Sequence, residues 1–306
     1  MHLLVAAPGS AVDETAAVDL GQSPAELVVL SAADSEIALL ADAHAALRAE
    51  LGDRMPALRL ANWLQLRHNL SVDLYVDKVV GHARIVIARV LGGRGYWPYG
   101  VDRIAASCRE SGAPLALLPG DAREDHELAD LSTLDAAARE ALQRCFLEGG
   151  AENARALLLR AAALAGADVP PAEAMPLPRA GRRNVRSRGR PVAAIVFYRA
   201  LTQSGDLDAV ERVGERVDRE GLDPHPLFVA SLKDPSASAF VRAELAASRL
   251  RVTGLVLGRK GHLEHFGIGA QASASSARVR DTDVIPWKDV VRFEADRIVV
   301  RDSEAQ

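Results

Sequence analysis

The sequence predicts an α/β fold: parallel-sheet units of the flavodoxin or Rossmann type with a helical insertion, followed by a short β-rich C-terminal segment. Three observations predict it. Short apolar runs with little polar alternation recur up to about residue 230, which is typical of strands buried on both faces of a sheet. Helical patterns separate these runs, which indicates parallel strands joined by covering helices. The last part of the chain instead holds brief β-like runs around a segment rich in Gly, Ala and Ser.

The N-terminal half supplies most of the predicted elements. Ser31 is a candidate cap for the first helix, which Gly52-Asp53 ends. Residues 58–66 read equally well as a helix or a strand, because a short apolar run fits both. The other predicted strands are residues 3–7, 27–30, 83–91 and 114–118. The predicted helices are residues 31–51, 73–80, 98–111, 134–148 and 152–164.

Residues 168–191 differ from their surroundings. They hold five prolines, four before and one after the basic string GRRNVRSRGR, so we interpret them as an interdomain linker. A βαβ pattern follows, with strands at 192–197 and 226–230 and helices at 206–220 and 235–247. The final β-like runs are residues 251–257, 283–291 and 297–301.

These changes of pattern predict four parts of the chain. They are an N-terminal α/β domain with a helical end at 1–167, a Pro/Arg-rich linker at 168–190, a second α/β unit at 191–247 and a small β-rich tail at 248–306.

Composition excludes several classes of protein. Of the 306 residues, 49% are hydrophobic and 25% are charged, as expected for a globular protein. The 37 Lys and Arg against 41 Asp and Glu give a net charge of −4, so no global basic field attracts nucleic acid. Two cysteines cannot form a disulfide framework, and no apolar run is long enough for a signal peptide or a membrane span. We therefore expect a cytoplasmic protein that does not bind membranes.

A glycine-rich loop follows the predicted strand 83–91. The string Gly92-Gly93-Arg94-Gly95 offers backbone amides that could hold an anion, but it lacks the spacing of a dinucleotide or P-loop motif. Its glycines equally suit a crowded strand end that requires positive φ. Tyr96, Trp97 and Tyr99 come next, and they are candidates either for stacking on a flat ligand or for anchoring the loop on the core.

A second candidate group follows the predicted strand 192–197. Open α/β sheets bind ligands at the carboxyl ends of their strands. Arg199 is a candidate for holding a carboxylate, and Ser204 and Asp206 for contacting a polar ligand. Ser204 or Asp206 could instead cap the next helix.

The remaining polar clusters are weak signals. His262, Glu264 and His265 form the one local histidine cluster, which lacks the spacing of a zinc helix. The arginines between 182 and 190 are basic enough to attract an anionic surface, and they also suit a solvated linker. No nucleophile motif such as G-x-S-x-G occurs. The residues alone indicate an α/β binding protein.

Longer strings carry a resemblance to a known family. They are VDLGQSPAELVVLSAADSEIALLA at 18–41, LRLANWLQLRHNLSVDLYVDKVVGHARIVIARVLGGRGYWPYGVDRIAA at 58–106, ALLPGDAREDHELADLST at 116–133, EGGAENARALLLRAAAL at 148–164 and the segment 191–246. In this order they resemble the CobN-type large subunit of aerobic cobaltochelatase, which is related to the large subunit of magnesium chelatase. The resemblance covers roughly residues 1–247.

The resemblance implies a role in inserting cobalt into hydrogenobyrinic acid a,c-diamide during cobalamin synthesis, by binding the tetrapyrrole or a partner subunit. It also implies AAA+ and von Willebrand-type partner subunits that hydrolyse ATP. Cobalt and ATP with Mg²⁺ are thus implied only for the complete complex, and this chain has no recognisable cofactor motif. Arg94, Tyr96, Trp97, Arg199, Gln203, Ser204 and Asp206 are the candidate ligand-binding residues, and no catalytic residue is assigned.

Two departures from the family bear on this expectation. Family members are several times longer than this chain, and the linker is shorter than the family's, so we expect a truncated or fused relative without the chelating body. The strings at 252–263 and 284–302 are similar to a PRC-barrel module, a small β-barrel. The alternatives are a non-catalytic docking protein with a barrel-like tail, and a degenerate product without function.

Overall fold

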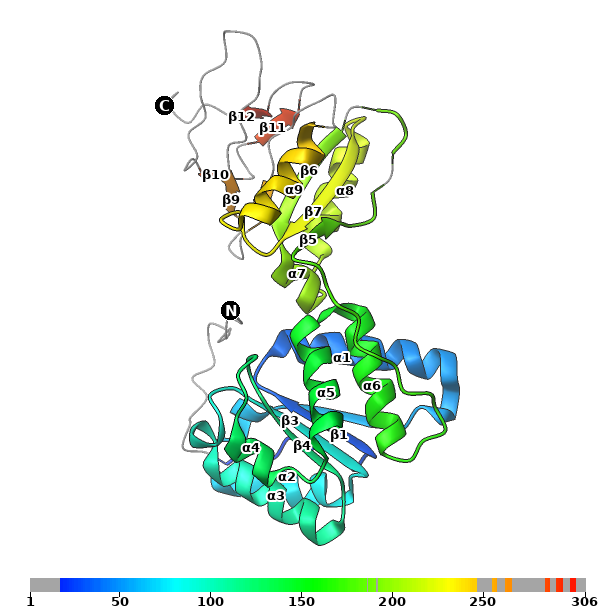
Figure 1. Ribbon diagram of the computed structural model, residues 1–306, viewed down its shortest axis with the longest axis vertical. Coiled ribbons are helices and arrows are strands. Elements are labelled where there is room, and N and C mark those ends of the chain that lie inside the picture. Colours follow the sequence, from blue (N-terminus) through cyan, green and yellow to red (C-terminus); the bar gives the residue numbers. More distant parts are fainter. Residues whose placement is uncertain are drawn as a thin grey trace. The chain divides into compact units, whose positions relative to one another are not determined.

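The structure is a computed structural model that describes residues 17–185, 187–190 and 192–246, together with the backbone of five short strands between 255 and 300. The chain divides into two compact units, Met1–Leu177 and Pro178–Gln306 (Figure 1). Each unit has its own sheet and its own hydrophobic core. The predicted strand at 3–7 lies outside the described residues.

The first unit is built on a parallel sheet with the strand order β2–β1–β3–β4. β1 (Leu27–Ser31) pairs with β2 (Leu58–Asn62) on one side and with β3 (Ile85–Val90) on the other, and β4 (Leu115–Pro119) completes the sheet beside β3. β1 and β3 are buried along their whole length. The parallel α/β fold predicted from the apolar runs is therefore confirmed.

Helices cover both faces of this sheet, α2 and α3 on one side and α1, α5 and α6 on the other (Figure 1). The helices are α1 (Asp34–Leu51), α2 (Asn69–Lys78), α3 (Pro98–Ser111), α4 (His126–Leu131), α5 (Ala136–Glu148) and α6 (Gly150–Leu164). Short 3₁₀ turns lie at Gly52–Arg54, Trp63–Gln65, Val80–His82 and Arg94–Tyr96.

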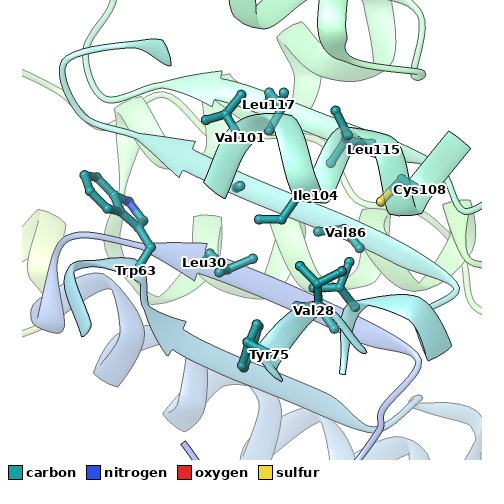
Figure 2. Close-up of a cluster of buried hydrophobic side chains, with 14 of the residues drawn as sticks. Val28, Leu30, Trp63, Tyr75, Val86, Val101, Ile104, Cys108, Leu115 and Leu117 are labelled. Atoms are coloured by element: carbon teal, nitrogen blue, oxygen red, sulfur yellow. The ribbon is translucent and has the colours of Figure 1, made fainter. Parts of the chain in front are cut away.

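Two apolar cores result from the alternation of side chains along the strands. Val28 and Leu30 of β1 join the core under α2 and α3, where Ile104 of α3 packs over the sheet (Figure 2). Leu27 and Val29 point to the opposite face and join the core under α1, α5 and α6. A sheet covered on both faces in this way favours apolar residues at most positions of its central strands β1 and β3, which explains the lack of polar alternation there.

Most element boundaries agree with the sequence. The helix predicted at 98–111 has these bounds, because Pro98 suits the first turn and Gly112, with φ of 75°, ends the helix in the left-handed conformation. The predicted cap at Ser31 is wrong: Ser31 belongs to β1, and α1 has no side-chain cap. The ambiguous stretch 58–66 contains both β2 and a 3₁₀ turn.

The second unit contains a smaller sheet with the order β5–β7–β6. β6 and β7 are parallel, as the βαβ pattern predicts, and β5 lies antiparallel at the edge. Its strands are β5 (Ala180–Arg182), β6 (Val192–Tyr198) and β7 (Asp223–Val229). Its helices are α7 (Arg199–Ser204), α8 (Asp208–Arg219) and α9 (Pro235–Ala246).

The latter part of the segment interpreted as a linker is folded into this second unit. Residues 180–182 form β5, and Arg182, Arg188 and Arg190 of the basic string pair with carboxylates. Arg182 donates two hydrogen bonds, of 2.6 and 2.7 Å, to the carboxylate of Glu244 in α9. The Nε of Arg190 donates to Asp223 at 2.8 Å. These partners lie far along the chain, so composition alone could not reveal them.

Glu244 gives the second unit a pH-dependent stability. Hydrogen bonds from Arg182 hold the pKa of Glu244 below its ordinary value, burial opposes this shift, and the ring of His225, 3.0 Å from the carboxylate, reinforces it. A depressed carboxyl pKa stabilises the fold above the unfolded-state pKa of about 4.3, and this contribution disappears as the pH falls through the folded-state pKa.

We therefore expect hydrogen exchange of β5 and β7 to accelerate as the pH is lowered below about 4.3, after correction for the intrinsic exchange rate. Glu244→Gln should reduce this acceleration, leaving the part due to Asp218 and Asp223, whose pKa values are also lowered. An identical pH profile in wild type and variant would contradict the prediction.

The remaining described strands are β8 (Leu255–Leu257), β9 (His262–His265), β10 (Val284–Pro286), β11 (Val290–Phe293) and β12 (Ile298–Val300). β8, β9 and β10 form one antiparallel sheet, and β11 pairs with β12. No helix in the described part of the chain combines the length and the apolar character that crossing a membrane requires.

Candidate functional site

The carboxyl edge of the first unit's sheet is the candidate functional site. The chain passes from β1 through α1 to β2 on one side, and β3 then returns to the other side of β1. The loops after β1 and β3 therefore diverge, and in open α/β sheets ligands bind at such a switch point. The residues following Ser31, Val90 and Pro119 converge at this edge.

A buried charge network holds these loops together. Arg89, near the end of β3, pairs with Glu36 of α1, and its Nη2 donates to the backbone oxygen of Gly120 at 2.8 Å. The hydroxyl of Ser31 donates to Glu36 at 2.6 Å. Arg89 is 5% exposed, and burial lowers its pKa to about 10. The network therefore joins β1, α1, β3 and the loop after β4 through one buried guanidinium.

The glycine loop after β3 is a tight turn. Gly92 and Gly93 have φ values of 84° and 73°, which only glycine adopts readily. The amide of Gly93 donates to Val90 and the carboxylate of Asp125 lies against Gly93, where a Cβ would be 2.5 Å from Oδ2. This negative charge disfavours an anion at Gly93, so the geometry fits the conformational interpretation of the glycines.

The aromatic string after this loop divides into a buried and an exposed part. Trp97 is 4% exposed and lies parallel to Trp63, with ring centroids 5.2 Å apart. Tyr96 is 62% exposed and meets Trp63 edge-on at 6.5 Å. The indole N–H of Trp63 donates to the buried backbone oxygen of Arg89, and the indole N–H of Trp97 donates to that of Leu66. Tyr96 is thus an accessible ring on a rigid aromatic support.

Arg94 belongs to the same 3₁₀ turn as Tyr96 and already has a partner. Its Nε and Nη2 donate to the two carboxylate oxygens of Asp102 at 2.9 and 2.8 Å. This pairing raises the pKa of Arg94 and lowers that of Asp102. Both side chains are more than a third exposed, so solvent reaches this ion pair.

A pocket of about 330 Å³ opens at the end of β4, between the loop 119–125, α4 and α5. It adjoins the glycine loop, because Asp125 both lines the pocket and contacts Gly93. Its lining includes apolar residues such as Leu117, Ala129 and Leu147. The charged residues of the lining are Arg123, Arg139, Arg144, Glu124, Asp125 and Glu140. The three arginines and three carboxylates give the lining of the pocket no net charge.

The second predicted group lies in the other unit. Arg199, Gln203 and Ser204 belong to α7, which directly follows β6, and Asp206 comes after it. The Nε of Arg199 donates to the backbone oxygen of Pro178 at 3.0 Å. The structure therefore places these residues after a strand, as predicted, but in a different unit from Arg94, Tyr96 and Trp97.

Neither Ser204 nor Asp206 caps α8. That helix starts after Leu207 and has no side-chain cap. The Ser204 hydroxyl instead donates to the oxygen of Leu201 at 3.2 Å and accepts from the amide of Asp206. The capping interpretation is therefore wrong, because Gly205 ends α7 and two further residues separate it from α8.

Sequence reasoning missed Glu36, Arg89 and Trp63. A lone arginine inside an apolar strand run was the available signal for Arg89, since a buried arginine requires a partner.

Among residues whose side chains the structure describes, no group of His, Cys, Asp or Glu could hold a metal ion. The side chains of His262, Glu264 and His265 lie outside this description. Burial raises the pKa of the Cys108 and Cys145 thiols to about 12 and about 11, which keeps them protonated.

Two curated proteins that are similar in sequence to this chain are both CobN subunits of aerobic cobaltochelatase. The chain is 40% identical over 262 residues to the aerobic cobaltochelatase subunit CobN of Pseudomonas aeruginosa, covering 81% of this chain and 21% of that protein. It is 38% identical over 255 residues to CobN of a Sinorhizobium species, covering 76% and 20%. The chain thus spans about a fifth of the length of these curated relatives. No model of a protein family matches the chain.

A solved structure resembles the fold as well. It is the catalytic subunit of cobaltochelatase from Mycobacterium tuberculosis, with a TM-score of 0.56 and 26% sequence identity. The match covers 72% of this chain and 17% of that one. Sequence and fold therefore point to the same relatives.

Proposed function

We propose that this chain, which is related in sequence to the CobN subunits of aerobic cobaltochelatase, binds a tetrapyrrole for cobalt insertion in cobalamin biosynthesis. The sequence similarity to CobN, which extends over 81% of this chain, supports a role in cobalt insertion. Because the match covers 21% of the relative, we assign this chain only the binding of the tetrapyrrole. The substrate is hydrogenobyrinic acid a,c-diamide. Insertion itself belongs to a complete assembly, with AAA+ and von Willebrand-type subunits that hydrolyse ATP.

The exposed ring of Tyr96 is the observation that carries this proposal. A macrocycle presents a flat, polarisable face, and an aromatic side chain offers a matching surface at low entropic cost. Tyr96 lies at the switch point of the sheet. Its ring packs edge-on against Trp63, which is itself stacked on Trp97. Leu91, 40% exposed at the start of the same loop, extends the apolar surface.

The chemistry of insertion defines what such a site must do. Cobalt(II) forms bonds to the ring nitrogens as the single inner N–H proton of the corrin leaves, so the macrocycle must be held with its nitrogens accessible. Stacking against one face and contacts to the peripheral side arms satisfy this requirement. Arg94 is suited to a peripheral carboxylate, because such a group can exchange with Asp102 on its two donors.

The same surface also supports a second candidate function, a docking module without a small ligand. Tyr96 and Leu91 are both exposed and adjoin one loop, as a protein contact would require. The two functions differ in whether the isolated chain binds the corrinoid.

We expect Tyr96→Ala to weaken binding of hydrogenobyrinic acid a,c-diamide about tenfold, since an aromatic pair contributes roughly 0.5–1.5 kcal/mol beyond its buried area. Tyr96→Phe should bind like wild type. Titration with quenching of the tryptophan fluorescence measures both constants.

Arg199→Ala tests the second unit in the same titration. A loss of binding in Arg199→Ala but not in Tyr96→Ala would place the ligand at α7 instead. No saturable binding by folded wild-type protein would favour the docking function.

A further inference from the structure

Three successive backbone oxygens at the end of β4 are held by side-chain donors. The Nε2 of Gln143 in α5 donates to the oxygens of Pro119 at 3.1 Å and Asp121 at 2.7 Å. Between these two, the Nη2 of Arg89 donates to the oxygen of Gly120 at 2.8 Å. Loops are ordinarily the more mobile parts of a domain, so three held peptide groups in succession indicate a loop that is fixed in place.

The loop 119–125 supports the glycine turn after β3 at two points. A Cβ on Gly120 would lie 2.7 Å from the Cα of Leu91, so the two backbones are in direct contact there. The carboxylate of Asp125 meets Gly93 at the second point, where a Cβ would be 2.5 Å from Oδ2. A displacement of the loop therefore displaces the glycine turn.

The glycine turn carries the ring of Tyr96. A Cβ on Gly92 would lie 2.9 Å from Cδ2 of Tyr96, so the ring rests directly on this glycine. The backbone amide of Tyr96 also donates to the oxygen of Gly93 at 3.1 Å. A continuous series of contacts thus leads from Gln143 through the loop 119–125 and the glycine turn to the exposed ring.

We propose that Gln143 is a positioning residue of the candidate site: by holding the loop 119–125, it places the Tyr96 ring where a macrocycle stacks. Both atoms that its Nε2 meets are backbone acceptors, so the position requires a donor side chain. The inference rests on the proposed function for the macrocycle, but the placement of the ring is measurable without a ligand.

Gln143 separates positioning from stability better than Arg89 does. Arg89 also holds the loop, but its removal leaves the carboxylate of Glu36 buried without its cation, which destabilises the whole unit. Gln143 is uncharged, and its replacement by an apolar side chain of similar length leaves no buried charge unpaired. We therefore vary Gln143.

The first readout is the NMR signal of the Tyr96 ring in the full chain without ligand, assigned by its loss in Tyr96→Phe. The ring meets Trp63 edge-on at 6.5 Å, so its chemical shift reports its place. Gln143→Met removes the donor and should move this signal, and Gln143→Lys, which keeps a donor, should restore it. Gln22→Met is the matched control, because Gln22 donates to the Leu60 oxygen of β2 at 2.9 Å, at the opposite edge of the sheet.

The second readout is binding of hydrogenobyrinic acid a,c-diamide. Gln143→Met should weaken it about fivefold, the equivalent of roughly one net hydrogen bond, and Gln143→Lys should recover most of this loss. Gly120→Ala is an independent variant in case Gln143→Met does not fold. Its methyl group would push Leu91 while both donors to the loop remain, so it should move the Tyr96 signal as well.

The outcomes distinguish this inference from the proposed function. An unmoved Tyr96 signal in folded Gln143→Met or Gly120→Ala, or an equal shift in Gln22→Met, would overturn the positioning role. A signal that moves only in Gln143→Met and Gly120→Ala, in a chain whose wild type binds no corrinoid, would overturn the proposed function and leave the placement of the ring by Gln143 standing.

Discussion

Arg89→Met is expected to lower the free energy of unfolding of the first unit by about 3–5 kcal/mol, because it leaves the carboxylate of Glu36 buried without its cation. Arg89 and Glu36 are 5% and 9% exposed, so water cannot replace the lost contact. The variant also removes the donor to the Gly120 oxygen. Urea denaturation followed by the near-ultraviolet dichroism of Trp63 and Trp97 measures this unit.

Arg155→Met is the matched control for this prediction. Arg155 pairs with Glu50 between α6 and α1 of the same unit, at 2.8 Å, but the two side chains are 34% and 55% exposed. Such pairs contribute about 0–1 kcal/mol. The double variant Glu36→Leu, Arg89→Met should recover much of the loss, since it removes both charges. Equal effects of Arg89→Met and Arg155→Met would refute the role assigned to the network.

The fold was predictable because it depends on local patterns. The runs IVIARV in β3 and LVVLS in β1 are mostly apolar and rich in β-branched residues, which favours strands in a sheet covered on both sides. Pro98 and Gly112 mark the ends of α3 by conformations that these two residue types favour. Such signals lie within a few residues of the element that they specify.

The candidate site was only partly predictable, because it depends on contacts across the chain. Tyr96 and Trp97 are neighbours of similar chemistry, and only the packing of Trp97 against Trp63 determines which ring stays exposed. Arg89 meets Glu36 from 53 positions away, and no local pattern links the two. From the sequence, Arg182 and Arg190 resemble part of a solvent-exposed basic linker. Their carboxylate partners, Glu244 and Asp223, lie on other elements and are not visible in the local pattern.

Gly100→Ala is expected to destabilise the first unit by about 3 kcal/mol, the upper part of the range for overpacking a core. Gly100 is buried in the first turn of α3, and a Cβ there would lie 1.9 Å from Cε2 of Trp97. The indole cannot yield easily, because it is stacked on Trp63 and donates to the oxygen of Leu66. Gly95→Ala, with nothing within 4 Å of the added methyl group, is the control and should cost far less.

A double variant identifies the cause of this loss. If the methyl group acts through the Trp97 ring, Trp97→Leu makes room for it, and Gly100→Ala should then cost much less than in wild type. Contacting residues of this kind show coupling of about 0.5–3 kcal/mol, which denaturation of the four proteins of the cycle resolves. The same displacement should disturb the support of Tyr96, so Gly100→Ala should also weaken corrinoid binding in protein that is still folded. Additive effects in the cycle, or unchanged binding, would mean that Trp97 does not support the exposed ring.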